Sequence, residues 1–535
     1  MRISCKVIFG VEARQKLLKG INTVADAVAS TLGPKSFNVA INEASGVPKI
    51  IKDGANVAKR IDLFDEFEDM GAQLLKEAAT QTETMAGDGT TTATIIAQSL
   101  INQAVENITA GKNSMVLKEE IEEAGKILVK KLKDLSKPVK KHQEIERVAN
   151  ISSANVEIGK MVADVFKKVG KNGVVRVEQG KTYETYVEYK RGVEFDRGYA
   201  SSSDAFITDR DRAEAVVENP FILLTDIKTN HTYQIIEFLN KFVEYCKSNS
   251  LPPHLLIIGE VQETALHTVV INHLREDIPF NALVVQAPAY GSRRLDELED
   301  LSIVVGGRVI RADSGRELKS VEIEELGRAE KIIVEKDKTI IQGGQGDDGR
   351  LKSRIKELDQ QIEIANTEYD KQVREERRAK LTGEMATIWV GATTEAEIDD
   401  KKERFRDAIE ACKSAVEEGI VAGGQVAFMY LSQQDFWPDS VGAKVLRKAI
   451  REPFKILIEN TGLDYAENLG KITPIKYPIA IDVNDGQVKD MIEAGIIDPA
   501  KVGRCAIENA ISVAGMAITT KTLISQVYSE NESKK

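Results

Sequence analysis

The sequence predicts a multidomain α plus α/β protein, in which both chain ends form one mostly helical unit and the middle forms an α/β unit. Three observations lead to this prediction. The chain has 535 residues, which is too many for a single hydrophobic core. Apolar residues recur at helical spacing near both ends. Between about residues 195 and 343, short apolar strands alternate with helical segments, as they do in a parallel sheet.

The composition is ordinary for a soluble globular protein. Hydrophobic residues make up 42% of the chain and charged residues 29%, and the net charge is −11. This acidic balance argues against nucleic acid as a partner, and no apolar run of roughly eighteen residues could span a membrane. The first residues lack the pattern of a secretory signal, and the four cysteines are too scattered for a disulfide or zinc motif. We therefore expect a cytoplasmic protein.

The N-terminal part combines long helices with two short strands. Leu17, Ile21, Val24 and Val28 share one helical face, and the Gly33-Pro34 pair ends that helix. The predicted helices cover residues 13–32, 64–80, 91–108 and 117–135, and the predicted strands cover residues 39–41 and 48–51.

One turn in this part has the chemistry of an anion and metal site. Residues 86–94 read Ala-Gly-Asp-Gly-Thr-Thr-Thr-Ala-Thr and lead into a helix. Such a turn presents free N–H groups and the positive end of a helix dipole, while Asp88 offers a hard oxygen ligand for Mg²⁺. A plain Gly-rich turn that caps a helix fits the same residues. The turns at residues 31–35 and 52–54 share this chemistry, although the second also fits a surface β-turn.

The middle of the chain begins with a small connecting unit and continues as α/β structure. The connecting unit is predicted to have a helix at residues 158–169 and strands at 173–178 and 183–189, followed by Gly192 as a candidate hinge. The α/β part is predicted to have strands at residues 221–225, 255–259, 282–285 and 303–305, and helices at 231–246, 263–275 and 293–298.

Two of these helices have unusually broad apolar faces. Leu266, Val269, Val270, Ile271 and Leu274 cover an arc of roughly 200°, whereas a helix on one sheet needs only about 100°. The helix at residues 231–246 has a similar face. Deep burial in a larger core explains this excess, and so does an exposed patch that binds other proteins.

The C-terminal part returns to helices. Residues 351–381 are predicted to form a charged helical hairpin or short coiled coil, whose charges make a solvated face. Asp407 lies in the next helix, which ends in a Gly-rich turn at residues 417–424. The predicted helices of this part cover residues 395–418, 445–460, 488–495 and 502–519.

Taken together, these motifs resemble those of the group I chaperonins of the GroEL type, over about residues 7–520. Several matches in the right order are far more specific than any one of them. The motifs that carry the resemblance lie at residues 31–35, 52–54, 87–94, 195–199, 415–424 and 495–499, with 512–515 after them.

The resemblance implies a GroEL-like division into three domains. The equatorial ATP-binding domain would comprise residues 1–134 and 417–535, the intermediate domain residues 135–190 and 385–416, and the apical domain residues 191–384. It also implies a homo-oligomeric ring of about seven subunits, in one or two layers. The implied partners are unfolded client proteins and a small lid co-chaperonin.

The resemblance further implies ATP and Mg²⁺ as cofactors, with K⁺ as an additional cation. Asp88 would bind the metal, Asp407 would orient the attacking water, and Asp53 would assist as a second catalytic carboxylate. The implied ATP-binding residues are Thr31, Leu32, Gly33, Pro34, Lys52, Asp88, Gly89, Thr90, Thr91, Thr92, Gly424 and Asp498. The implied client-binding residues are Tyr199, Phe206, Ile236, Leu239, Leu266, Val270 and Ile271.

Several positions depart from the family pattern, which indicates a divergent member such as a paralogue or a viral copy. Gln425 replaces the last glycine of a triplet, Glu384 replaces a hinge glycine, and Glu106 stands where a basic residue is common between rings. The loop at residues 201–204 is longer and more polar than usual.

Three functions remain open on the sequence. The first is an ATP-driven machine for protein folding, which the three carboxylates favour. The second is a holdase ring that binds unfolded protein without productive ATP coupling. The third is a small-molecule kinase or ATPase, which the resemblance over nearly the whole chain disfavours.

Overall fold

The structure is a computed structural model that describes residues 4–42, 49–51, 53–170, 173–180, 182–200, 204–210, 213–275, 280–365 and 367–527. The chain divides into a helical unit, residues 1–164 and 399–535, and an α/β unit, residues 165–398. The predicted α/β insertion between two helical ends is therefore present. The two boundaries fall within the segments predicted as intermediate domain, and the division into three domains stays a prediction.

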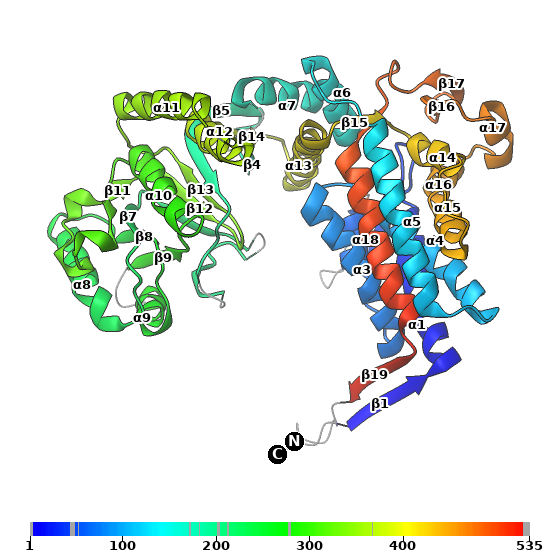
Figure 1. The fold of residues 1–535 in the computed structure, drawn as a ribbon, viewed down its shortest axis with the longest axis horizontal. Coiled ribbons are helices and arrows are strands. Elements are labelled where there is room, and N and C mark those ends of the chain that lie inside the picture. The colour runs from blue at the N-terminus through cyan, green and yellow to red at the C-terminus, as the bar shows by residue number, and fades with distance from the viewer. Residues whose placement is uncertain are drawn as a thin grey trace. The chain divides into compact units, whose positions relative to one another are not determined.

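The helical unit is built around its last helix, α18 (Ala500–Thr519), which lies against α3, α4 and α5 (Figure 1). Helices α5 and α18 approach closely at Gly125, which has no side chain. A Cβ atom at this position would lie 2.3 Å from Cδ1 of Ile511 on α18, which is too close. The other helices are α1 (Gly10–Ala29), α2 (Gly54–Lys59), α3 (Glu66–Ala86), α4 (Thr90–Thr109), α5 (Ser114–Leu135), α6 (His142–Ser153), α7 (Val156–Val169), α13 (Glu395–Glu418), α14 (Val426–Ser432), α15 (Val441–Ala449), α16 (Glu452–Asn460) and α17 (Tyr465–Ile472).

Among the described residues, the strands of the helical unit form four two-stranded antiparallel pairs. Two of these pairs join segments far apart in the sequence, because β1 pairs with β19 and β15 pairs with β18. The pairs are β1 (Ser4–Phe9) with β19 (Thr522–Val527), β2 (Val39–Ile41) with β3 (Lys49–Ile51), β15 (Ile420–Ala422) with β18 (Ile497–Pro499), and β16 (Ile479–Asp482) with β17 (Gln487–Asp490).

The α/β unit contains a parallel sheet in the order β10-β7-β8-β9, with the short β11 antiparallel to β7. All five residues of β7 are buried, as expected for a strand covered on both faces. Its elements are β7 (Phe221–Thr225), α8 (Thr232–Ser248), β8 (His254–Ile258), α9 (Glu263–His273), β9 (Asn281–Val285), α10 (Ser292–Val305), β10 (Val309–Ile310) and β11 (Gly327–Arg328).

A second sheet of the α/β unit has the strand order β4-β14-β5-β13-β12-β6. Its centre is β5 (Tyr186–Phe195), which pairs with β14 up to Arg191 and with β13 from Gly192 onward. The other elements are β4 (Val174–Gln179), β6 (Ala215–Glu218), β12 (Lys331–Val334), β13 (Thr339–Gln342), the helical hairpin α11 (Asp348–Glu363) and α12 (Glu368–Thr382), and β14 (Glu384–Val390).

Strands β4 and β6, which stand at the two ends of this strand order, are connected by an ion pair. Arg176 of β4 donates from Nη2 to both carboxylate oxygens of Glu214, which precedes β6, at 2.7 and 2.9 Å. An apolar cluster of Ile333, Ile340 and Met385 fills the space between the two halves. The sheet therefore folds back on itself around β5.

Several sequence predictions differ from the structure. The apolar run 303–305 ends helix α10 instead of forming a strand, because short apolar runs fit either element. The predicted helix 445–460 is interrupted before Pro453, which lies in the first turn of α16. The predicted helix 488–495 contains β17 and turns, and helix α6 was not predicted.

Among the described residues, no helix is long and apolar enough to cross a membrane.

Candidate functional site

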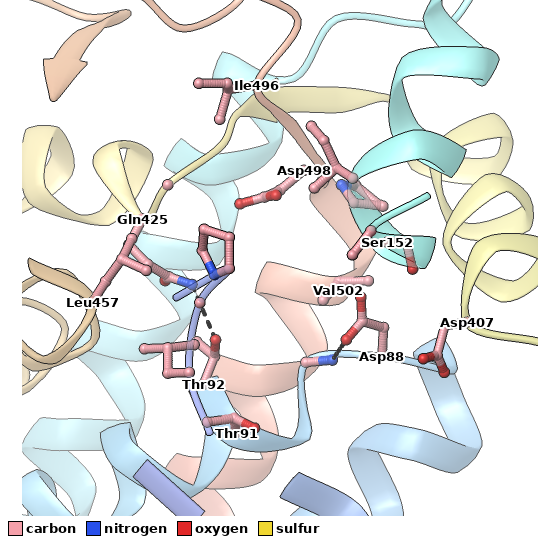
Figure 2. Close-up of a pocket in the computed structure, with 18 of the residues that line it drawn as sticks. Asp88, Thr91, Thr92, Ser152, Asp407, Gln425, Leu457, Ile496, Asp498 and Val502 are labelled. Carbon is pink, nitrogen blue, oxygen red and sulfur yellow. Dashed lines mark hydrogen bonds between the residues drawn. The ribbon is translucent and has the colours of Figure 1, made fainter. Parts of the chain in front are cut away.

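A cavity of about 720 Å³ opens in the helical unit, at the N-terminus of α4. Its walls come from both chain ends. Helix α4 faces three later segments, namely strand β18, helix α13 and the turn that joins β15 to α14 (Figure 2). Of the predicted ATP-binding and catalytic residues, all those that the structure describes line this cavity. They are Thr31, Leu32, Gly33, Pro34, Asp53, Asp88, Gly89, Thr90, Thr91, Thr92, Asp407, Gly424 and Asp498. Lys52 lies outside the described residues.

The turn before α4 requires its two glycines. Gly87 and Gly89 have φ angles of 69° and 87°, which side-chain-bearing residues rarely adopt. A Cβ atom on Gly87 would lie 2.2 Å from Glu410 Cβ, and one on Gly89 would lie 2.6 Å from Val502 Cγ1. No side chain among the described residues caps α4, so the N–H groups of its first turn face the cavity. Such an uncapped helix start suits a phosphate group.

Asp88 stands in this turn with the chemistry of a cation ligand. Although Asp88 is open to the cavity, protein atoms surround it closely, and this desolvation, together with the nearby Asp53, raises the pKa of its carboxyl group. Within the described ranges, no group of three or more ligating side chains could hold a metal ion by itself. The carboxylate oxygens of Asp88 are hard ligands of the kind that Mg²⁺ prefers.

Two further carboxyl groups of the cavity also have raised pKa values. Burial, reinforced by the charges of Asp88, Glu403 and Asp53, raises the pKa of Asp407 to about 9. Burial and the charge of Asp88 raise the pKa of Asp498 to about 7. Such a concentration of negative charge is costly in an empty cavity, and a bound cation would offset it.

Asp53 has a structural role in addition to its charge. It caps α2, because its side chain accepts hydrogen bonds from the backbone N–H groups of Ala55 at 3.2 Å and Asn56 at 2.8 Å. A cap of this kind fixes the start of α2 and holds the Asp53 carboxylate near the cavity.

The opposite wall is formed by the loop after α1 and by the turn after β15. Gly33 has a φ of 98°, and a Cβ atom there would lie 2.5 Å from Leu457 Cδ1. Gly424 has a φ of 65° and lies close to Asp498, because β15 and β18 are paired. The structure thus brings Gly424 and Asp498 to the turn of residues 87–92, more than three hundred positions earlier in the chain.

Sequence reasoning missed part of this lining. Ser152 and its neighbours at the end of α6 face the cavity, as do Gln425, Leu457 and Val502. Val148 and Ala149 form the buried side of α6 and are the apolar residues that could have indicated this helix. The residues around them are mostly polar, so they form no clear apolar pattern. Nothing in their local pattern connects these residues to the turn of residues 87–92.

The predicted client-binding residues fall into two groups in the α/β unit. Phe206 and Leu239, both predicted to bind clients, belong to the hydrophobic core at 1% and 3% exposure, so neither offers apolar surface to a client in this structure. Leu239 lies on α8 and Val269 on α9, and both are buried, so the broad apolar faces of these helices are explained in part by deep burial. The partly or fully accessible members are Tyr199, Ile236, Leu266, Val270 and Ile271.

The comparisons with known proteins agree with this geometry. The model of the TCP-1/cpn60 chaperonin family matches residues 24–527. Two crystal structures of the chaperonin gp146 from the bacteriophage EL 2 (Pseudomonas aeruginosa), both determined in the presence of ATP-BeFx, share this fold. Their TM-scores are 0.74 and 0.65, at 21% identity, over 97% of this chain and 98% and 99% of theirs.

The predicted multidomain α plus α/β fold and the chaperonin resemblance drawn from the motifs are therefore confirmed. The family match covers most of the chain, including both halves of the cavity and the α/β unit between them. The chain belongs to the TCP-1/cpn60 chaperonin family.

Proposed function

We propose that this protein is an ATP-dependent chaperonin, which binds unfolded proteins through the α/β unit and uses ATP hydrolysis to drive a folding cycle. The observation that carries this proposal is the cavity, in which an uncapped helix start faces a group of carboxylates. Phosphoryl transfer depends on positioning and charge compensation, and this arrangement supplies both. The ATP-BeFx used with the phage chaperonin is consistent with the same ligand here.

Each part of the cavity has a role in this proposal. The turn from Gly89 to Thr92 would hold the phosphates, and Asp88 would hold Mg²⁺ against their oxygens. The Mg²⁺ would neutralise charge on the phosphates. Gly424 and Asp498 would contact the ribose and base. Lys52, next to Asp53 in sequence, is proposed to act near the phosphates.

Asp407 is the proposed catalytic residue, and its ionisation would depend on the cation. With a pKa of about 9, its carboxyl group keeps its proton near pH 7 when the cavity is empty. A cation beside Asp88 favours the charged form of the neighbouring carboxyl groups. Asp407 would then ionise and orient a water molecule by accepting its hydrogen bond. Because Asp407 lies on α13, hydrolysis would also depend on the position of that helix.

Clients would bind to apolar side chains on α8 and α9. On α9, Ile271 is 48% exposed and its neighbour Leu274 is 59% exposed. An unfolded chain presents apolar surface without a fixed shape, and such helices bind it through buried area. We propose that the subunits assemble into a ring of about seven copies, which a lid co-chaperonin closes.

The test is a comparison of the wild type with Asp407→Ala in ATP turnover and in refolding of a denatured client. We expect ATP-dependent refolding by the wild type and the loss of most turnover and refolding in the variant. Asp399→Ala is the matched control, because Asp399 lies on the same helix with its side chain 75% exposed, and it should retain both activities. Client protection that is indifferent to ATP and to Asp407→Ala would instead identify a holdase.

A further inference from the structure

Gln425, which lines the cavity, has an unfavourable local environment. It lies between β15 and α14 with a φ of 62°, directly after Gly424, whose φ is 65°. The left-handed conformation is disfavoured for a residue with a long side chain. In addition, its Oε1 atom is buried and has no hydrogen-bond partner among the described residues. A residue that combines backbone strain with an unpaired buried acceptor commonly serves a bound ligand.

The other end of the carboxamide is held in place. Gln425 Nε2 donates to Thr92 Oγ1 at 3.1 Å, so the side chain reaches across to the first turn of α4. Thr92 is itself buried. This bond fixes the rotation of the carboxamide of a residue that lines the cavity, and it leaves Oε1 without a partner among the described side chains and backbone groups.

The position of Gln425 indicates which part of a nucleotide it meets. In Figure 2 it lies apart from Asp88 and Asp407, which mark the proposed metal and hydrolysis end. Gly424, its neighbour in sequence, lies close to Asp498. The oxygens of a phosphate chain only accept hydrogen bonds and cannot satisfy Oε1. The ribose hydroxyls and the exocyclic amino group of adenine are the donors that a nucleotide offers.

We propose that Gln425 determines nucleoside specificity in this cavity, an inference that rests on the proposed binding of ATP. Its Oε1 accepts a hydrogen bond from the nucleoside, either from a ribose hydroxyl or from the amino group of the base. Its Nε2 at the same time holds Thr92 in the phosphate-binding turn. The carboxamide thus links recognition of the nucleoside to the start of α4.

The test is equilibrium binding to the full-length protein by calorimetry, with ADP so that no turnover occurs. The other probes are 2′-deoxy-ADP, 3′-deoxy-ADP, inosine diphosphate and pyrophosphate, which lacks the nucleoside. We expect the wild type to prefer ADP over one of the three nucleotide analogues by about fivefold, or about 1 kcal/mol, the usual value of one neutral hydrogen bond.

Gln425→Gly should weaken ADP binding by about fivefold and leave that analogue and pyrophosphate unchanged. Gln425→Glu keeps the acceptor, so it should keep the preference even if its charge weakens all binding. In the absence of nucleotide, Gln425→Gly should also raise the melting temperature, since it removes the backbone strain and the unpaired acceptor. Gln103→Ala, on α4 outside the cavity lining, is the control and should change none of these values.

Three outcomes would overturn the inference. An unchanged preference for ADP in Gln425→Gly would show that the carboxamide does not contact the nucleoside. Equal losses of ADP and pyrophosphate binding would place it on the phosphates. Failure of the wild type to bind ADP would refute the proposed function, and the inference with it, whereas the first two outcomes leave the proposed function intact.

Discussion

Asp407 links the chemistry of the cavity to the stability of the protein. Its carboxyl pKa rises from 3.8 to about 9 in the folded state, chiefly by burial. The folded protein therefore retains a proton that the unfolded chain releases near pH 4. The stabilisation from that proton is complete below about pH 4 and is lost as the pH rises through 9.

Replacing Asp407 with asparagine removes this titration. Without nucleotide or metal, we expect Asp407→Asn to melt at a higher temperature than the wild type, by a margin that grows between pH 5 and pH 9. Differential scanning fluorimetry across this range measures the margin. Asp399→Asn, at an exposed position on the same helix, should show no such trend. A margin that stays constant with pH would contradict the assignment of the titration to Asp407.

Residues differ in how far the sequence could reveal their roles. Asp88 could be found because two glycines flank it and three threonines follow, and both glycines are needed there by a close contact and a positive φ. Gln425 and Ser152 could not, because their cavity positions depend on segments that meet only in the folded chain. The burial of Phe206 and Leu239 was equally hidden, since an apolar side chain gives the same signal in a core and on a binding surface.

At the scale of elements, a buried ion pair joins the two ends of the sheet that folds back around β5. Arg176 and Glu214 are each about nine-tenths buried, and Glu335 adds a third partner at 3.3 Å. The two halves of the sheet otherwise meet through a small apolar cluster. Removing one partner of a buried pair leaves an uncompensated charge, which costs more than the pair itself contributes.

We therefore expect Arg176→Ala to lower the free energy of unfolding of the α/β unit by about 3–5 kcal/mol. The double variant Arg176→Leu with Glu214→Leu should lose much less, because it buries no lone charge. Urea unfolding followed by Trp389 fluorescence in a Trp437→Phe background reports on this unit, since Trp389 lies in β14.

Lys190→Ala is the matched control for this experiment. Lys190 pairs with Glu330 at 2.8 Å in the same sheet, but its side chain is 33% exposed. Its loss should therefore cost less than about 1 kcal/mol. Equal costs for Arg176→Ala and Lys190→Ala would show that burial does not set the strength of the Arg176 pair.

Periodicity predicted most of the long elements and failed where an element is short or polar. Helix α13 and strand β7 occupy the predicted residues, because each has a clear apolar pattern and clear ends. Helix α6 has only three buried residues, and β17 is a four-residue strand with two exposed side chains. Such elements owe their form to their neighbours, and a local pattern contains little trace of them.

For the whole molecule, the prediction concerns assembly. Short strands near the chain ends and after α1 expose apolar side chains: Phe9 is 65% exposed, Ile50 61% and Ile524 57%. In the proposed ring, copies of the chain would cover these residues. The particle mass by light scattering should be about seven or fourteen times the 59.0 kDa of one chain, for one or two rings.

Phe9→Lys combined with Ile50→Lys should shift that mass toward a single chain, because each places a charge in an apolar contact. Ile364→Lys is the control, since Ile364 is 74% exposed beyond the end of α11 and should leave the mass unchanged. A wild type with the mass of one chain would contradict the ring, and a double variant that stays assembled would contradict the contact.

The central place of α18 in the helical unit has a consequence for how each copy is synthesised. Helices α3, α4 and α5 are complete at Leu135, but the helix that they lie against begins only at Ala500. At typical rates of translation, the intervening stretch of roughly 365 residues takes roughly 20–70 s to emerge from the ribosome. During that interval the parts of these three helices that pack on α18 lack that partner. Every newborn subunit is thus, for a time, the kind of chain that the finished protein is proposed to rescue.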